Sequence, residues 1–141
     1  MDIYYKPISE SGKQMINYVC KYAPVELFKG FGQECAVLEE MPENFDKSDK
    51  IAHANLCGFG KSVIQAVLEG KVEELVLVNC CDSMRRVYDI IENTKKCKFL
   101  YMLDLPHEDN ECENIKFAQS ILRLKKAYER YSHRTFDREL F

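Results

Sequence analysis

Residues 75–86, Leu-Val-Leu-Val-Asn-Cys-Cys-Asp-Ser-Met-Arg-Arg, join a short apolar run directly to a segment with helical periodicity. The apolar run, 75–78, predicts a strand, and the segment 83–92 predicts a helix whose first turn Asp82 is placed to cap. The apolar positions of this helix are Met84, Val87, Ile90 and Ile91. The stretch is therefore one strand-to-helix unit, the kind of unit from which α/β folds are built.

Further strands and helices alternate along the rest of the chain. Apolar stretches of strand length predict strands at 15–19, 99–103 and, more weakly, 35–38. Segments with helical periodicity predict helices after Pro24, over 59–70 and over 114–131. The polar, proline-containing segments 41–50 and 105–113 are predicted to be loops. This order predicts the fold class α/β, a doubly wound, mainly parallel three- to four-stranded sheet with flanking helices.

Composition and charge exclude several classes of protein. With 141 residues, 46% of them hydrophobic and 30% charged, the chain has the make-up of one globular domain. Its net charge is −3, and it has no run of basic residues clear of acids, so a nucleic-acid partner is not expected. It also lacks a signal peptide and any apolar run near the roughly 20 residues that cross a bilayer, so we expect a cytoplasmic protein without a membrane span.

The cysteines are the residues most able to carry chemistry. There are seven, at positions 20, 35, 57, 80, 81, 97 and 112. Their odd number and the absence of a secretion signal argue against a disulfide framework, and no CxxC pair indicates a zinc ribbon. Cys57 and Cys81 each lie at the start of a predicted helix, where the helix dipole favours the thiolate that binds metal. The alternative is that they are small buried apolar residues, which is the commoner state of a free cysteine.

The remaining cysteines and one other motif have simpler predicted roles. Cys80 should point away from Cys81 into the core, Cys35 and Cys97 should be core or strand-edge residues, and Cys112 should be an exposed thiol in an acidic loop. Gly60-Lys61-Ser62 imitates the end of a phosphate-binding loop, but Asn55 replaces its first glycine and no buried strand precedes it, so nucleotide binding is not expected.

Other residues near the two cysteines have candidate roles. The Gly58 and Gly60 positions would let an inorganic cluster approach the backbone closely. His53 is either a ligand, an acid or base, or a hydrogen-bonding residue, and the last is the commoner role of a lone histidine. Arg85 and Arg86 could meet anionic groups such as a coenzyme A phosphate, with one of the two expected to be surface charge.

Four short motifs, in this order and spacing, resemble the 2-hydroxyglutaryl-CoA dehydratase D-component family, which includes benzoyl-CoA reductase subunits and double-cubane cluster proteins. The motifs are Tyr18 to Leu27 with its Pro-x-Glu-Leu turn, His53 to Gly58, Val78 to Arg86 with its Asn-x-Cys-Asp segment, and Tyr101 to His107 with its Asp-x-Pro ending. The resemblance covers nearly the whole chain. It corresponds to the N-terminal half of such a subunit.

The resemblance implies a 4Fe-4S cluster held by three cysteines of one subunit. Cys57 and Cys81 match two of these ligands, and Cys20 is a candidate for the third, which the family takes from a second α/β half. Glu26, His53 and Arg85 are the candidate substrate-binding residues, and no residue is a convincing general base. The implied reaction is the radical elimination of water from a 2-hydroxyacyl-CoA, a lyase activity of anaerobic metabolism. The implied partners are an ATP-dependent activator protein, an acyl-CoA substrate and a homologous subunit.

The resemblance also shapes our expectations about the limits of the chain. Residues 1–134 would form the N-terminal α/β lobe, and residues 135–141 would begin a following segment that is absent, so the fragment is expected to be inactive alone. Apolar terminal residues, namely Phe136, Leu140 and Phe141, would lack cover and favour a homodimer. The alternative functions are a non-catalytic redox or double-cubane-type cluster module, and an interaction domain whose cysteines belong to the core.

Overall fold

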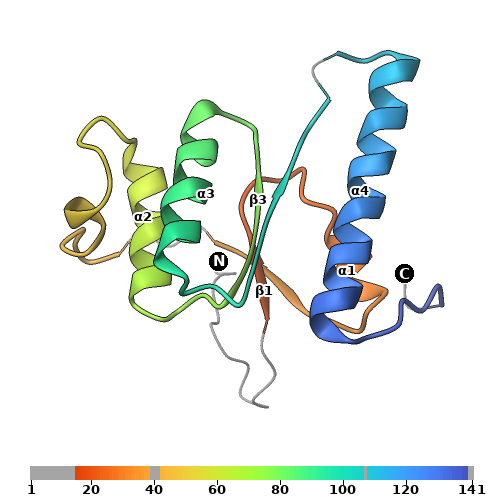
Figure 1. Cartoon of the computed structure of the whole chain (residues 1–141), viewed down its shortest axis with the longest axis horizontal. Coiled ribbons are helices and arrows are strands. Elements are labelled where there is room, and N and C mark those ends of the chain that lie inside the picture. Colours follow the sequence, from red (N-terminus) through yellow and green to blue (C-terminus); the bar gives the residue numbers. More distant parts are fainter. Residues whose placement is uncertain (1–14, 39–41, 107, 140–141) are drawn as a thin grey trace.

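The computed structural model describes residues 15–38, 42–106 and 108–139, which form one parallel sheet between two layers of helices (Figure 1). The four-stranded sheet has the order β2-β1-β3-β4. Its strands are β1 (Ile16–Tyr18), β2 (Cys35–Val37), β3 (Glu74–Val78) and β4 (Phe99–Leu103). Every paired neighbour runs parallel. The α/β prediction is therefore confirmed, including the weaker strand near residue 35.

The α-helices occur where the apolar periodicity predicted them, with small differences at their ends, and a short 3-10 helix lies in the segment 41–50 that was predicted to be a loop. They are α1 (Val25–Lys29), the short 3-10 helix η1 (Ser48–Lys50), α2 (Gly58–Leu68), α3 (Asp82–Thr94) and α4 (Glu111–Ser132). α4 begins three residues earlier than predicted because the Asn110 side chain accepts a hydrogen bond from the Glu113 amide and caps the first turn. Cys81, not Asp82, is the N-cap residue of α3, so the predicted cap was wrong by one position.

β3 separates two hydrophobic core layers. Leu75 and Leu77 belong to the layer under α2 and α3, whereas Val76 and Val78 belong to the layer under α1 and α4. All five residues of β3 are buried. α2 and α3 cover one face of the sheet and α1 and α4 cover the other (Figure 1). A strand with apolar side chains on both faces requires this arrangement, because each face must be covered.

The second layer contains a buried polar contact between α4 and β3. The Tyr128 hydroxyl donates a hydrogen bond to the Glu74 carboxylate at 3.3 Å, and both residues are buried. Desolvation raises the pKa of Glu74. The contact joins the last turns of α4 to the start of β3, at the edge of the sheet opposite the carboxyl ends of the strands.

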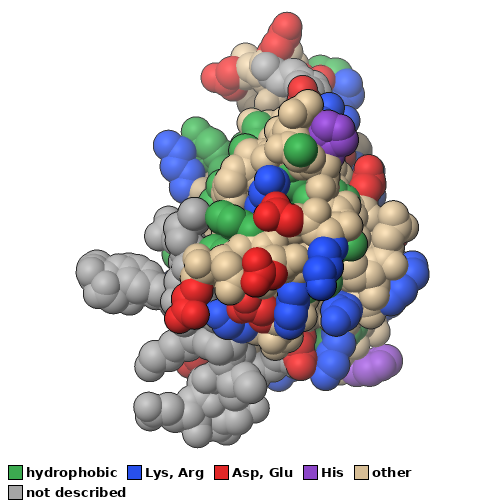
Figure 2. Space-filling view, turned by 90° about the vertical axis from the view of Figure 1, so that its left-hand side faces the viewer, with side chains coloured by type: hydrophobic (Ala, Val, Ile, Leu, Met, Phe, Trp, Pro, Cys, Tyr) green, Lys and Arg blue, Asp and Glu red, His purple; other side chains and the backbone are tan. Residues whose placement is uncertain are grey.

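The surface shows mixed charge. Lys and Arg side chains lie among Asp and Glu side chains over the α2 side of the molecule (Figure 2). Among the helices that the structure describes, none is long and apolar enough to span a bilayer.

Phe136 folds back onto the domain, which corrects one expectation. Its ring contacts Phe31 edge to face, with ring centroids 5.3 Å apart, and the Lys125 amine lies 4.9 Å from its centroid. The residue is half-buried against the layer under α1 and α4. Phe136 is therefore not an uncovered terminal residue. Leu140 and Phe141 lie outside the described residues, so the predicted self-association stays a prediction.

The close approach of Phe136 to Gly30 leads to a stability prediction. An alanine Cβ at Gly30 would overlap the Phe136 ring, although the Gly30 φ of −61° is an ordinary value. We expect Gly30→Ala to lower the free energy of unfolding by about 1 to 3 kcal/mol, as overpacking does, measured by urea denaturation.

Two variants control this measurement. Gly58→Ala adds the same methyl group where nothing lies within 4 Å, so it should cost much less. The effect of Gly30→Ala should also shrink in a Phe136→Ala background, because the overlapping ring is gone. Equal unfolding midpoints for Gly30→Ala and Gly58→Ala would contradict the packing described.

Candidate functional site

The carboxyl ends of β1 and β3 define the topological switch point of the sheet. These strands are neighbours, with Tyr18 opposite Val76. The chain leaves β1 toward α1 on one face and leaves β3 toward α3 on the other. Loops that diverge in this way open a crevice where α/β proteins bind ligands. The two loops carry Cys20 on one side and Asn79, Cys80 and Cys81 on the other.

Cys57 lies at the same edge, as the N-cap residue of α2. Its sulfur accepts a hydrogen bond from the Gly60 amide at 3.3 Å. This bond and a second one from the Ser83 hydroxyl lower the pKa of the exposed Cys57 thiol. Ser83 belongs to the first turn of α3, so a side chain of α3 lies beside the thiol at the N-terminus of α2. The result is an accessible thiol in the environment that favours a thiolate.

Cys81 and Cys20 occupy different positions at this edge. Cys81 is exposed, and as the N-cap residue of α3 it makes no side-chain capping bond. Cys20 is half-buried and packs against both core layers. Its backbone has a φ of 88°, in the left-handed region that residues with a Cβ seldom adopt. The structure therefore places all three predicted ligands at the carboxyl edge of the sheet, with different exposure.

Cys80 is exposed, which contradicts its predicted place in the core. The strand ends at Val78, and the Cys80 amide donates to the Val78 carbonyl at 2.8 Å, so the chain turns before strand alternation reaches Cys80. Cys80 instead shares a side-chain hydrogen bond with Cys20. Desolvation, followed by this bond, raises the pKa of Cys80 to about 11.

The other cysteines have structural environments. Burial raises the pKa of Cys35 and of Cys97 to about 12, which suits the predicted core or strand-edge role. Cys112 is exposed as predicted, but it lies in the first turn of α4 rather than in a loop. Within the ranges 15–38, 42–106 and 108–139, no three or more His, Cys, Asp or Glu side chains are grouped so that they could hold a metal ion.

The glycines after Cys57 serve different purposes. A Cβ at Gly58 would meet nothing within 4 Å, so the space beside this backbone is open, as predicted for a site that a bulky group approaches. A Cβ at Gly60 would lie 3.1 Å from Val87 and 3.2 Å from Leu56. Gly60 therefore lets α2 pack closely against α3, and the approach of a cluster to its backbone stays a prediction.

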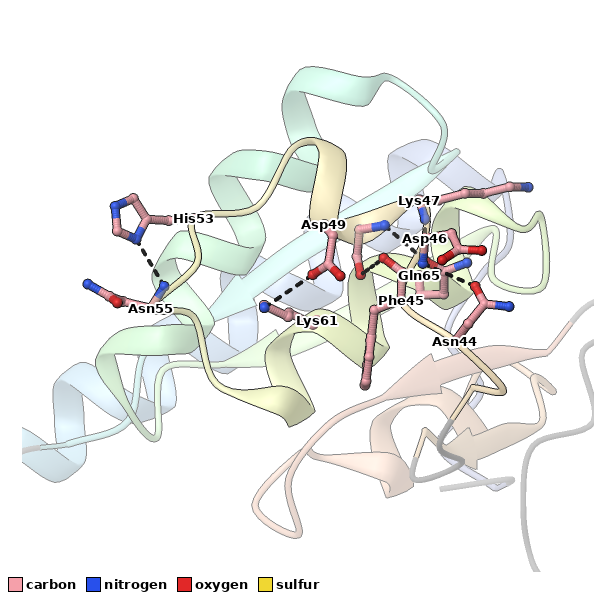
Figure 3. Close-up of polar contacts among 10 residues, drawn as sticks. Asn44, Phe45, Asp46, Lys47, Asp49, His53, Asn55, Lys61 and Gln65 are labelled. Carbon is pink, nitrogen blue, oxygen red and sulfur yellow. Dashed lines mark hydrogen bonds and ion pairs between the residues drawn. The ribbon is translucent and has the colours of Figure 1, made fainter.

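The loop before Cys57 is anchored to α2 (Figure 3). The side-chain oxygen Oε1 of the buried Gln65 accepts hydrogen bonds from the Lys47 and Ser48 backbone amides at 3.0 and 2.9 Å. Lys61 pairs with Asp49 at 3.1 Å. These contacts hold the segment that delivers Cys57 to its helix, and they give Lys61 an ion-pairing role in place of a phosphate-binding one.

His53 lies in the same loop, and one of its ring nitrogens accepts a hydrogen bond from the backbone. Its Nδ1 accepts a hydrogen bond from the Asn55 amide at 3.0 Å, and the side chain is exposed (Figure 3). A neutral His53 therefore carries its proton on Nε2. This is the local hydrogen-bonding role that a lone histidine most often has.

Arg85 lines a cleft of about 480 Å³ between α3, the end of β4 and α4. We call it the cationic cleft because three of its five charged lining residues are basic, the two acidic ones being Asp104 and Glu113. Lys116 and Arg123 of α4 also line it. Asn79 shapes the cleft: its amide donates to Asp104 at 2.9 Å and its oxygen accepts from the Leu105 amide at 2.7 Å. An amide directly after a buried strand was the one signal in the sequence for this role.

Glu26 lies elsewhere, on the rim of an apolar groove of about 710 Å³ between α1 and α4. The three predicted substrate-binding residues therefore belong to three different features. Glu26 lines this groove, His53 lies in the loop before α2, and Arg85 lines the cationic cleft.

The family model for 2-hydroxyglutaryl-CoA dehydratase, D-component, matches residues 20–141. The chain belongs to this family. A search of the curated proteins found no match. The D-component match spans all the strand ends described above except that of β1, so the carboxyl edge of the sheet lies almost wholly within the matched region.

The contact between Ser83 and Cys57 predicts a pH effect in this D-component protein. Ser83→Ala removes a donor that stabilises the thiolate, so the Cys57 pKa should rise toward its ordinary value of 9.0. The pH profile of alkylation by iodoacetamide should then move to higher pH, followed on the tryptic peptide 51–61, which contains only this cysteine. Ser132→Ala, at the far end of α4, is the matched control and should leave the profile unchanged. Identical profiles for all three proteins would contradict the contact.

Proposed function

We propose that this chain is the iron-sulfur cluster-binding lobe of a 2-hydroxyacyl-CoA dehydratase-like protein, with Cys57 and Cys81 as two thiolate ligands of a 4Fe-4S cluster. One observation carries the proposal: two exposed cysteines occupy the N-cap positions of neighbouring helices, and, after the Gly60 amide, Ser83 of α3 lies close enough to the Cys57 thiol of α2 to lower its pKa. Family membership supports the dehydratase-like class.

The donor set fits a thiolate-bound cluster in its chemistry. Cluster iron is held by deprotonated cysteines, and the Gly60 and Ser83 donors favour that form of Cys57. The open space beside Gly58 leaves room next to the backbone. Cys20 is the candidate third ligand, and it would have to give up its hydrogen bond with Cys80. The alternatives for that ligand are a partner subunit and a solvent molecule.

When bound, such a cluster supplies a single electron to a thioester carbonyl, so that an unactivated hydroxyl group can leave. The chain's own residues would hold and orient the reactants. Cys57 and Cys81 present the thiolates, and the loop held by Gln65 keeps Cys57 at its helix end. The electron would come from an ATP-dependent activator protein, as a partner in the anaerobic cytoplasm.

The cationic cleft is the proposed site for the phosphates of an acyl-CoA. Arg85 lies four residues after Cys81 on α3, so one helix would carry both a cluster ligand and a phosphate contact. Lys116 and Arg123 add positive charge, while Glu113 already pairs with Lys116 at 3.1 Å. Guanidinium groups suit phosphate because they offer paired donors in a fixed plane.

Anaerobic reconstitution with iron and sulfide tests the cluster. We expect the wild-type chain to retain iron and sulfide in stoichiometric amounts, with thiolate-to-iron absorption, and Cys57→Ser and Cys81→Ser to lose most of both. Cys97→Ala is the control, because this thiol lies just before β4 at the opposite edge of the sheet. Iron retention by Cys57→Ser equal to that of Cys97→Ala would refute the proposal. The amount of iron that Cys20→Ser retains decides whether Cys20 is the third ligand.

Calorimetric titration with coenzyme A tests the phosphate site. Arg85→Gln should weaken binding by about tenfold or more, the size of a lost hydrogen bond to a charged group. Arg86→Gln is the matched control, because this neighbouring exposed arginine does not line the cleft. Equal losses in both variants would indicate general charge attraction. Cluster incorporation without coenzyme A binding would favour the redox-module alternative.

A further inference from the structure

The Cys20 and Cys80 side chains meet where β1 and β3 end. Each residue lies two positions beyond the last residue of its strand, and these strands are hydrogen-bonded neighbours. The Val19 amide donates to the Val76 carbonyl at 3.1 Å, so the pairing continues toward Cys20. The Cys80 amide turns back to the Val78 carbonyl at 2.8 Å, which keeps Cys80 close to that level. Besides desolvation, the Cys20 side chain lies close enough to that of Cys80 to raise the pKa of the Cys80 thiol.

The backbone of Cys20 is held in an unusual conformation. A φ of 88° is costly for a residue with a Cβ and persists only where the surroundings impose it. Here the Ala23 amide donates to the Cys20 carbonyl at 3.1 Å, and the side chain packs against both core layers. The fold thus holds a half-buried thiol at the boundary of the two layers, beside an exposed thiol from the adjacent strand end.

We propose that Cys20 and Cys80 are a dithiol pair that low-molecular-weight disulfides, such as glutathione disulfide, oxidise to an intramolecular disulfide. This inference does not depend on cluster binding. Neighbouring strands lie about 4.8 Å apart, a separation that a disulfide can span. The register places Cys20 level with Val78, and the turn of the chain back to the Val78 carbonyl brings Cys80 toward that level. Cys81 is the competing partner of Cys80, but adjacent Cα atoms are about 3.8 Å apart, which is below the usual disulfide range.

The exchange is balanced by the disulfide that it consumes. One protein thiolate attacks a sulfur of glutathione disulfide, which forms a mixed disulfide and releases one glutathione thiolate. The second protein thiol, as its thiolate, then attacks the protein sulfur of that mixed disulfide and releases the second glutathione. The two cysteines lose two electrons and two protons in total, and glutathione disulfide is reduced to two glutathione molecules.

The Cys20–Cys80 disulfide would change which thiols are free in the crevice at the ends of β1 and β3. It would tie the loop after β1 to the loop after β3, and it would leave Cys57 and Cys81 as free thiols. Cys20 would no longer be able to bind metal. Excess dithiothreitol would reverse the change, because an exposed sulfur such as that of Cys80 is open to attack.

Peptide mapping of the folded, metal-free chain after treatment with glutathione disulfide tests the proposal. Trypsin places Cys20 in peptide 14–21 and Cys80 with Cys81 in peptide 72–85, so the proposed bond gives one linked species. We expect it in the wild type and in Cys81→Ser, and its loss in Cys80→Ser, Cys20→Ser and the urea-unfolded wild type. Circular dichroism of each variant checks that it has folded.

Three other outcomes would overturn the proposal. These are a Cys80–Cys81 bond confined to peptide 72–85, a linked species that persists in Cys80→Ser, and stable mixed disulfides with glutathione at Cys20 or Cys80 without cross-linking. A linked species that forms equally well in urea would also overturn it, because the fold would then contribute nothing to the pairing.

Discussion

The complete burial of β3 is the constraint on which the rest of the structure depends. Its five residues lie between β1 and β4, and its side chains alternate between two hydrophobic layers. An apolar strand of this kind is stable only when helices cover both faces. α2 and α3 supply one cover and α1 and α4 the other. The point where this strand ends, at Val78, then determines where the chain turns and which residues reach the carboxyl edge.

The pKa of a cysteine thiol in this protein depends on where the residue lies relative to that edge. Cys57 sits at a helix N-terminus, where backbone and hydroxyl donors lower the pKa of its thiol. Cys35 and Cys97 are half-buried, and desolvation raises their pKa to about 12. The thiols suited to chemistry are those at helix starts, because a thiolate needs donors that a buried apolar environment lacks. This contrast supports metal or redox roles at the edge and packing roles elsewhere.

Sequence patterns predicted some residues of the candidate site and missed others. The helical starts at Cys57 and Cys81 follow from apolar spacing, because periodicity shows where strand gives way to helix. Cys80 could not be predicted, since alternation holds only while the strand lasts and the turn at Val78 depends on one backbone hydrogen bond. No sequence pattern indicated that Arg123 lines the cationic cleft. A charged residue on a helix face looks the same whether it faces open solvent or a cleft beside another element.

The sequence by itself determined the α/β class, the parallel pairing and the edge at which the candidate ligand cysteines lie, because apolar periodicity and strand-helix order are local properties of the chain. Tertiary structure alone decided which side chains meet across that edge. The Ser83 donor to Cys57, the contact of Cys20 with Cys80, and the position of Phe136 over Gly30 each join residues distant in sequence. Such contacts arise only when strands pair and helices pack, so no local pattern encodes them.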